Sequence, residues 1–134
     1  MDMKKKLSKE SKKVLCELGY YYINSREYEK AVAIFNSLII IDDQLPFRYG
    51  LANVFFSKSD YDKALEICRD ILDDYPGDTT AKLMMAENLI FKKRDSEAAV
   101  LLDQVLGSDA DEASMKLARD LKQGISQGIS SYAG

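Results

Sequence analysis

The chain has 134 residues, enough for a single domain, and a formal net charge of −3 at pH 7. Its composition is 46% apolar with only 7 glycines and 2 prolines, which favours long helices joined by short turns. Histidine, the usual general base near neutral pH, is absent. No uncharged stretch reaches the roughly 18 residues that a membrane span needs. We therefore expect neither an enzyme nor a membrane protein.

The beginning of the chain is basic. Residues 1–13 carry six lysines against two acidic residues, whereas the rest of the chain is acidic. A basic segment of this kind could touch a membrane or nucleic acid, but a solvated, frayed terminus is the interpretation we prefer. The acidic remainder argues against nucleic acid as a partner. We therefore assign residues 1–11 to a flexible N-terminus.

Apolar and small residues then recur in three copies, offset by 33 and 34 residues. Each copy has a bulky, a small and a bulky position on one helical face, then an alanine and two apolar positions on a second helix. The small positions allow the two helices to approach closely. The copies are Leu18, Gly19, Tyr22, Ala31, Phe35, Leu38; Leu51, Ala52, Phe55, Ala64, Cys68, Ile71; and Met85, Ala86, Leu89, Ala98, Leu102, Val105.

The periodicity predicts helices at about 9–24, 28–41, 45–57, 61–74, 79–92, 95–107 and 110–123. Ser59 with Asp62, and Asp109 with Glu112, have the spacing of capping boxes. The repeats then cover about 12–44, 45–78 and 79–110. A last helix at about 110–123 covers the apolar end of the third repeat and completes a single domain over 12–123. Residues 124–134 are expected to form a flexible tail.

The two cysteines lie in predicted helices, far apart in sequence. Cys68 occupies the position of Phe35 in the first repeat, so we interpret it as a small buried apolar group. Without histidine or a Cys-x-x-Cys spacing, zinc has no plausible ligand set. The acidic residues around the sequence Tyr75-Pro76-Gly77 lack the alternating oxygen ligands of a calcium loop. We expect no metal and no cofactor, and reduced thiols in a cytoplasm.

The repeat resembles the tetratricopeptide repeat, which has a 34-residue period. Tyr28 and Tyr61 each stand three residues before the alanine that opens the frame's second half, and Pro76 stands where that family ends a repeat. The third repeat departs from the pattern, because no tyrosine precedes Ala98 there. The resemblance implies an all-α fold: a right-handed superhelical array of three helix pairs plus a C-terminal capping helix.

In such an array the first helix of each pair lines a concave groove. The positions predicted to line it are largely aromatic and aliphatic, with no lysine or arginine that could hold a peptide carboxylate. We therefore predict that the groove binds an extended or helical peptide with apolar anchors, although single positions could instead pack between repeats. The predicted lining is Cys16, Tyr20, Ile23, Tyr49, Asn53, Phe56, Leu83, Glu87 and Ile90.

A narrower resemblance is to the translocator (class II) chaperones of bacterial type III secretion. It is carried by the sequences around Gly50-Leu51-Ala52 and Ala86-Glu87. It implies a cytoplasmic chaperone that binds an apolar segment of a secretion substrate, without nucleotide. Members of that family form homodimers with the help of an N-terminal extension that is longer than the segment before the first repeat here. A homodimer of this chain is therefore kept as an open alternative.

The small needle-subunit chaperones of the same secretion systems are a variant of this interpretation. They would have a polymerising needle protein as cargo and a small helical co-chaperone as a further partner. An alternative from a different functional class is a general scaffold, which bridges protein partners without a release step.

Overall fold

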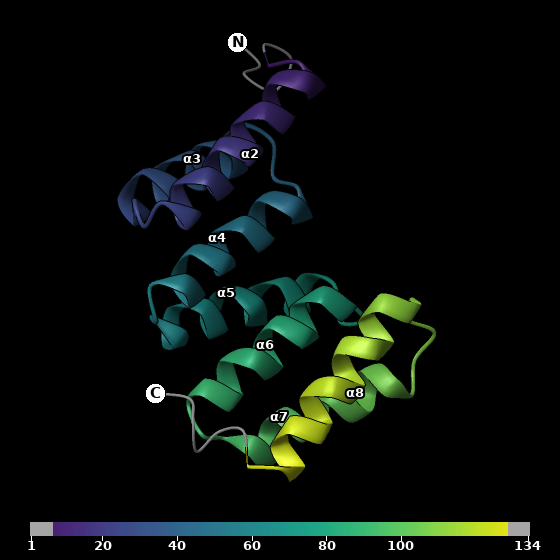
Figure 1. The fold of residues 1–134 in the computed structure, drawn as a ribbon. Coiled ribbons are helices and arrows are strands. Elements are labelled where there is room, and N and C mark those ends of the chain that lie inside the picture. Colours follow the sequence, from purple (N-terminus) through teal and green to yellow (C-terminus); the bar gives the residue numbers. More distant parts are fainter. Residues whose placement is uncertain (1–6, 129–134) are drawn as a thin grey trace. The chain divides into compact units, whose positions relative to one another are not determined.

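The computed structural model describes residues 7–128, and this part consists of seven α-helices without a β-strand (Figure 1). The all-α prediction is therefore confirmed. The helices are α2 (Lys9–Asn24), α3 (Tyr28–Ile41), α4 (Leu45–Ser57), α5 (Tyr61–Asp74), α6 (Thr79–Phe91), α7 (Asp95–Leu106) and α8 (Glu112–Ser126).

The predicted helix boundaries agree with the observed ones to within about three residues, the usual uncertainty at helix ends. The largest difference is at α8, which begins at Glu112 and continues to Ser126. Most of the predicted flexible N-terminus and of the predicted tail lies outside the described residues, since residues 1–6 and 129–134 are not described. Among the helices of residues 7–128, none is both long enough and apolar enough to cross a bilayer.

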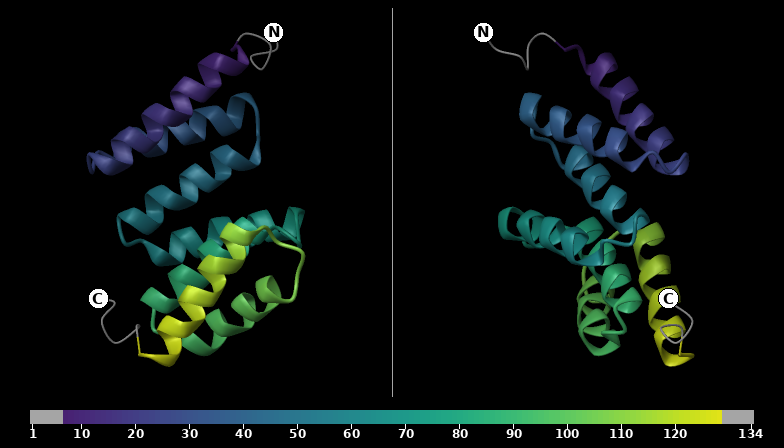
Figure 2. Two further views of the ribbon diagram at one scale, coloured as in Figure 1. Left: turned by 45° about the vertical axis from the view of Figure 1, so that its right-hand side comes forward. Right: turned by 90° about the vertical axis from the view of Figure 1, so that its left-hand side faces the viewer.

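The chain divides into two compact units, one ending at Ile67 and the other beginning at Cys68, within α5. In the first unit α3 packs between α2 and α4, and α2 also contacts α4 (Figure 2). In the second unit α7 packs against α6 and α8, and α6 also contacts α8. In each unit three helices thus bury their apolar faces against one another, as expected for stacked helix pairs.

The core of the first unit is built around the ring of Phe35, which is completely buried. A Cβ atom added at Gly19 on α2 would lie 2.6 Å from Cζ of this ring. One added at Gly50 on α4 would lie 2.2 Å from Cε1. The ring therefore fills the space that two glycines leave open. The close approach predicted at Gly19 is confirmed, whereas the same role of Gly50 was not predicted.

The turns between the paired helices share one backbone conformation. Arg26, Ser59 and Lys93 have positive φ angles of 61°, 65° and 61°, and they are spaced by the repeat offsets of 33 and 34 residues. After each of them a backbone N–H donates to a carbonyl five residues earlier, as in a Schellman motif. These bonds run from Glu27 to Tyr22, from Asp60 to Phe55 and from Arg94 to Leu89, each at 2.8 Å.

The two predicted capping boxes are wrong by one or two residues. Asp60, and not Ser59, caps α5, because its carboxylate accepts the backbone N–H three residues later at 3.2 Å. Ser59 has the left-handed backbone described above, whereas an N-cap residue needs an extended one. Asp111, and not Asp109, caps α8, where its carboxylate accepts a backbone N–H at 2.7 Å.

An ion pair that was not predicted joins the start of α2 to the end of α3. Nζ of Lys12 lies 3.0 Å from Oδ2 of Asp42, and both side chains are largely withdrawn from solvent. Gln44 also donates its amide N–H to the same carboxylate. One lysine of the basic N-terminal segment therefore contributes to the fold of the first unit.

Candidate functional site

Six of the predicted lining positions lie in the first unit, on α2 and α4. Ile23 is buried in the core of this unit, so it offers no surface to a partner. The other five are partly exposed, and we call them the α2–α4 lining: Cys16, Tyr20, Tyr49, Asn53 and Phe56.

Tyr20 and Asn53 join the two helices of the α2–α4 lining. The side-chain amide of Asn53 donates a hydrogen bond to the phenol oxygen of Tyr20 at 3.1 Å. The Tyr20 ring meets the buried Phe35 ring edge-on, with centroids 5.3 Å apart. Burial raises the pKa of the Tyr20 phenol, so it stays neutral. Equivalent positions of the first two repeats are thus brought side by side, as the repeat frame predicts, and the Tyr20 ring is packed against the core.

Tyr49, Asn53 and Phe56 follow one another at spacings of four and three residues, which places them on one face of α4. The Phe56 ring lies 5.8 Å from the ring of Tyr61, at the start of α5. Cys16 is four residues before Tyr20 on α2, and burial raises the pKa of its thiol. The α2–α4 lining therefore combines aromatic rings, one amide and one neutral thiol.

The other three predicted lining positions lie on α6, in the second unit. Leu83 and Ile90 are buried. For these two positions, burial supports the alternative that they pack inside the protein and do not line a groove. Glu87, between them, is half-buried, and this burial raises the pKa of its carboxyl group. Of the three, only Glu87 has a polar group that is partly open to solvent.

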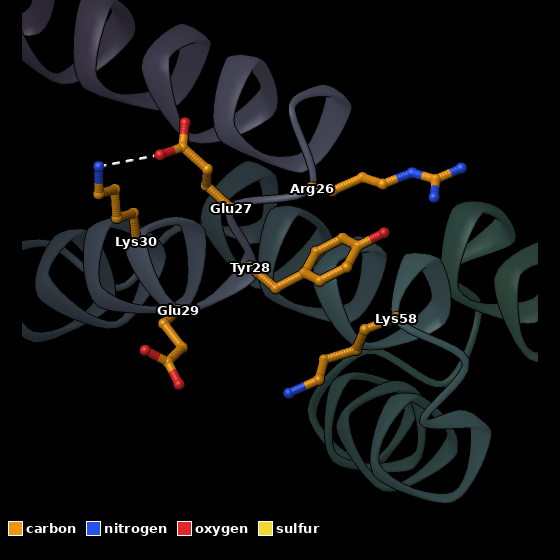
Figure 3. A pocket seen from close by; sticks show the side chains of 6 residues that line it. All are labelled: Arg26, Glu27, Tyr28, Glu29, Lys30 and Lys58. Atoms are coloured by element: carbon orange, nitrogen blue, oxygen red, sulfur yellow. Dashed lines mark hydrogen bonds and ion pairs between the residues drawn. The ribbon is translucent and has the colours of Figure 1, made fainter.

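A polar hollow of about 460 Å³ lies at the start of α3 in the first unit. Figure 3 shows that its wall mixes acidic and basic side chains, with Lys30 paired to Glu27 at 2.9 Å. The Tyr28 hydroxyl donates to the backbone carbonyl of Ser57 at 3.2 Å, which ties this turn to the end of α4. Because the charges of both signs are mixed, the hollow does not favour a ligand of either charge. We interpret it as part of the turn.

A second, apolar hollow of about 240 Å³ lies between α2 and α3 and was missed by the sequence analysis. Leu15 and Ile41 are part of its wall, and Ile40, at the end of α3, is 85% exposed. A sequence signal was available, because the second repeat has Asp73 and Asp74 where the first has Ile40 and Ile41. The first unit thus carries more exposed apolar surface than the repeat pattern requires.

Cys68 is fully buried, as predicted, and burial raises the pKa of its thiol to about 12. It is therefore unsuited to nucleophilic chemistry at neutral pH. Between residues 7 and 128 no three His, Cys, Asp or Glu side chains come close enough together to hold a metal ion.

Comparisons with known proteins agree with the repeat frame. Residues 55–120 match the family model of the tetratricopeptide repeat. The matched stretch is just under half of the chain. A relative is tetratricopeptide repeat protein 21B of Xenopus laevis, which is 23% identical over 99 residues; the match covers 73% of this chain but only 8% of that much longer protein.

A solved structure with a similar fold is the type III secretion translocator chaperone SycD of Yersinia enterocolitica, in a crystal form described as an alternative dimer. It matches this chain with a TM-score of 0.74 at 19% identity, over 91% of this chain and 96% of that one. The predicted resemblance to translocator chaperones is therefore confirmed for the fold.

Proposed function

We propose that this protein is a non-catalytic chaperone built of tetratricopeptide repeats, and that it binds an apolar segment of another protein. The observation that carries the proposal is the α2–α4 lining, where partly exposed aromatic rings surround Asn53. Aromatic side chains supply large contact areas, and they dominate the binding energy of many interfaces. No lysine or arginine belongs to the lining, so an apolar segment suits it better than a free carboxylate.

The hydrogen bond between Asn53 and Tyr20 supports this proposal physically. It fixes both side chains before a partner arrives, so that little rotamer entropy remains to be lost on binding. A partner's apolar side chains would then cover the rings of Tyr20, Tyr49 and Phe56. Each square ångström of apolar surface removed from water contributes about 25 cal/mol.

We further propose that the bound protein is a type III secretion substrate, either a translocator or a needle subunit, held in the bacterial cytoplasm before export. The support is the fold shared with a translocator chaperone and the sequence resemblance around Gly50-Leu51-Ala52. The alternative is a general scaffold. A chaperone keeps its substrate soluble and releases it to the export machinery, whereas a scaffold stays in the assembly.

The test is co-expression with candidate secretion substrates encoded nearby, followed by calorimetric titration of the complex. The double variant Tyr49→Ala, Phe56→Ala should weaken binding by roughly tenfold or more, since each removes an aromatic contact. Helical content measured by circular dichroism should be nearly unchanged. Tyr75→Ala is the control, because Tyr75 is exposed in the turn after α5. Unchanged affinity in the double variant would refute the binding site.

A specific observation also supports a homodimer. Val14, Leu18 and Tyr21 form an apolar stripe on α2 and are 59%, 37% and 61% exposed. The equivalent residues of the second repeat, 33 positions later, are Phe47, Leu51 and Val54, which pack in or against the core of the first unit. The α2 stripe thus has the character of a helix face that packs against another helix, and we propose that it pairs with α2 of a second copy.

Sedimentation equilibrium tests this homodimer. Leu18→Glu should yield monomers, because it places a charge in the centre of the stripe. Leu117→Glu on α8 is a matched control, since Leu117 is 38% exposed and lies in the other unit. A wild-type chain that is monomeric at high concentration would rule the homodimer out.

A further inference from the structure

The face of α2 that carries part of the α2–α4 lining continues toward the start of the helix. Lys9, Lys13, Cys16 and Tyr20 follow one another at spacings of four, three and four residues. At 3.6 residues per turn, these four positions lie within an arc of about 60° on the helix surface. Cys16 and Tyr20 belong to the lining, and the two lysines extend the same face beyond it by about one and two turns.

Both of these lysines are exposed, and no carboxylate among residues 7–128 lies within ion-pair distance of either one. Lys12, between them in sequence, differs because it is paired with Asp42. Asp43, in the loop before α4, already has a partner in Arg48, at 2.6 Å. Glu17 borders this face of α2 but forms no ion pair with either lysine. The first unit therefore holds two cations without a counter-charge at one end of the lining.

Their position is unfavourable for the helix itself. Lys9 is the first residue of α2, directly after the N-cap Ser8. A positive charge there is repelled by the positive end of the helix dipole. Lys9 and Lys13 are also four residues apart, and like charges at this spacing repel each other on a helix surface. A carboxylate bound between the two lysines would relieve both repulsions.

We propose that the apolar segment bound by the α2–α4 lining also carries an acidic side chain, which pairs with Lys9 and Lys13. This inference rests on the proposed function, because the two lysines lengthen the face that the segment is proposed to cover. Apolar side chains of the segment would cover the rings of Tyr20, Tyr49 and Phe56, while its carboxylate lies at the start of α2. The surface is thus apolar at one end and basic at the other, and this difference fixes the direction in which the segment lies.

The helix geometry predicts the spacing between the acidic residue and the apolar ones. Lys13 and Lys9 precede Tyr20 by seven and eleven residues, which is about 10 and 16 Å along the helix axis. An extended segment advances about 3.3–3.6 Å per residue. Its acidic residue would therefore stand about three to five residues from the apolar residue that covers Tyr20, and about seven to eleven residues away if the segment is helical.

The test uses a random peptide library displayed on phage and selected against the full chain. Wild type should enrich peptides that combine apolar residues with an aspartate or glutamate. The double variant Lys9→Gln, Lys13→Gln should enrich apolar peptides without that acidic residue. The matched control is Lys116→Gln, Lys122→Gln on α8, which removes the same charge from another exposed helix surface and should leave the acidic preference intact.

One enriched peptide is then synthesised with its glutamate or with glutamine in the same position. Wild type should bind the glutamate form roughly threefold to tenfold more tightly, as expected for two exposed ion pairs. This preference should fade as sodium chloride is raised from about 50 mM to about 500 mM, because salt screens exposed charges. The variant Lys9→Gln, Lys13→Gln should bind both forms about equally, and circular dichroism checks that its helices are intact.

The two proposals fail in different ways. If no enriched peptide loses affinity in the variant Tyr49→Ala, Phe56→Ala, the proposed function itself fails. If apolar peptides are enriched and depend on those aromatic residues, but carry no acidic residue, only the role of the two lysines is overturned. A preference for glutamate that persists in Lys9→Gln, Lys13→Gln overturns that role as well.

Discussion

Replacing Gly50 by alanine tests how tightly the core of the first unit is packed. The added Cβ would lie 2.2 Å from Cε1 of Phe35 and 2.5 Å from its Cδ1 and Cζ, far inside van der Waals contact. The ring has little room to move toward α2, because it already packs closely against Gly19, where an added Cβ would lie only 2.6 Å from Cζ. The alanine must therefore displace the ring or push α4 away.

The expected magnitude is a balance of two effects. Overpacking of a core costs about 1–3 kcal/mol. Alanine in a helix interior regains up to about 1 kcal/mol over glycine. We therefore expect Gly50→Ala to lower the free energy of unfolding by about 1–2 kcal/mol, measured by urea denaturation with circular dichroism. Gly77→Ala is the control, because a Cβ at Gly77 meets nothing within 4 Å.

A second substitution isolates the contact itself. Phe35→Leu removes the outer ring atoms and by itself should cost less than the roughly 3–5 kcal/mol of a truncation to alanine. Combined with Gly50→Ala it should cost less than the sum of the two single changes, because the smaller side chain leaves room for the new methyl group. Strict additivity, or a Gly50→Ala variant that is more stable than wild type, would refute the packing argument.

Three further predictions concern single side chains. Asn88→Val should raise the free energy of unfolding by about 1 kcal/mol in urea denaturation, because the buried Oδ1 of Asn88 finds no hydrogen-bond partner within residues 7–128 and the equivalent residue Val54 is fully buried. A loss of stability would contradict this prediction. Iodoacetamide should alkylate Cys16 well before Cys68 at pH near 8, as followed by mass spectrometry, since the Cys68 thiol is buried with a pKa of about 12; equal rates would show that the second unit opens readily. A backbone hydrogen bond at the start of α8 lowers the pKa of Asp111, so the stability that this cap contributes is present above the ordinary aspartate pKa and is lost as pH falls through the lowered one. The stability difference between wild type and Asp111→Ala, measured by urea denaturation, should therefore shrink on acidification below about pH 4. A constant difference would speak against the ionised cap.

The repeat spacing predicted the helices well because it depends only on which residues share a helical face. It could not predict what covers that face. Leu83 and Ile90 have the register of lining residues, yet the packing of the second unit buries them. The sequence pattern at these positions is equally compatible with a buried and an exposed aliphatic residue.

The repeat pattern also could not predict contacts between residues that are far apart in sequence. Lys12 and Asp42 are 30 residues apart and pair only because α2 and α3 form an antiparallel pair. Gly50 was noticed for its sequence context, but its packing role depends on the position of the Phe35 ring. The hydrogen bond between Asn53 and Tyr20 was closer to prediction, since both residues were placed on one surface by the repeat offset.

The turns at Arg26, Ser59 and Lys93 have a practical consequence for engineering. A left-handed backbone conformation costs a residue with a side chain about 1–2 kcal/mol of stability, and glycine avoids this cost. Part of that gain is lost again, because glycine gives up more conformational entropy on folding than other residues do. The protein is thus less stable than its own architecture permits, at one corresponding point in every repeat. Glycine at these three sites offers a graded way to strengthen the array, one repeat at a time, without altering any packed side chain or any residue proposed to meet a partner.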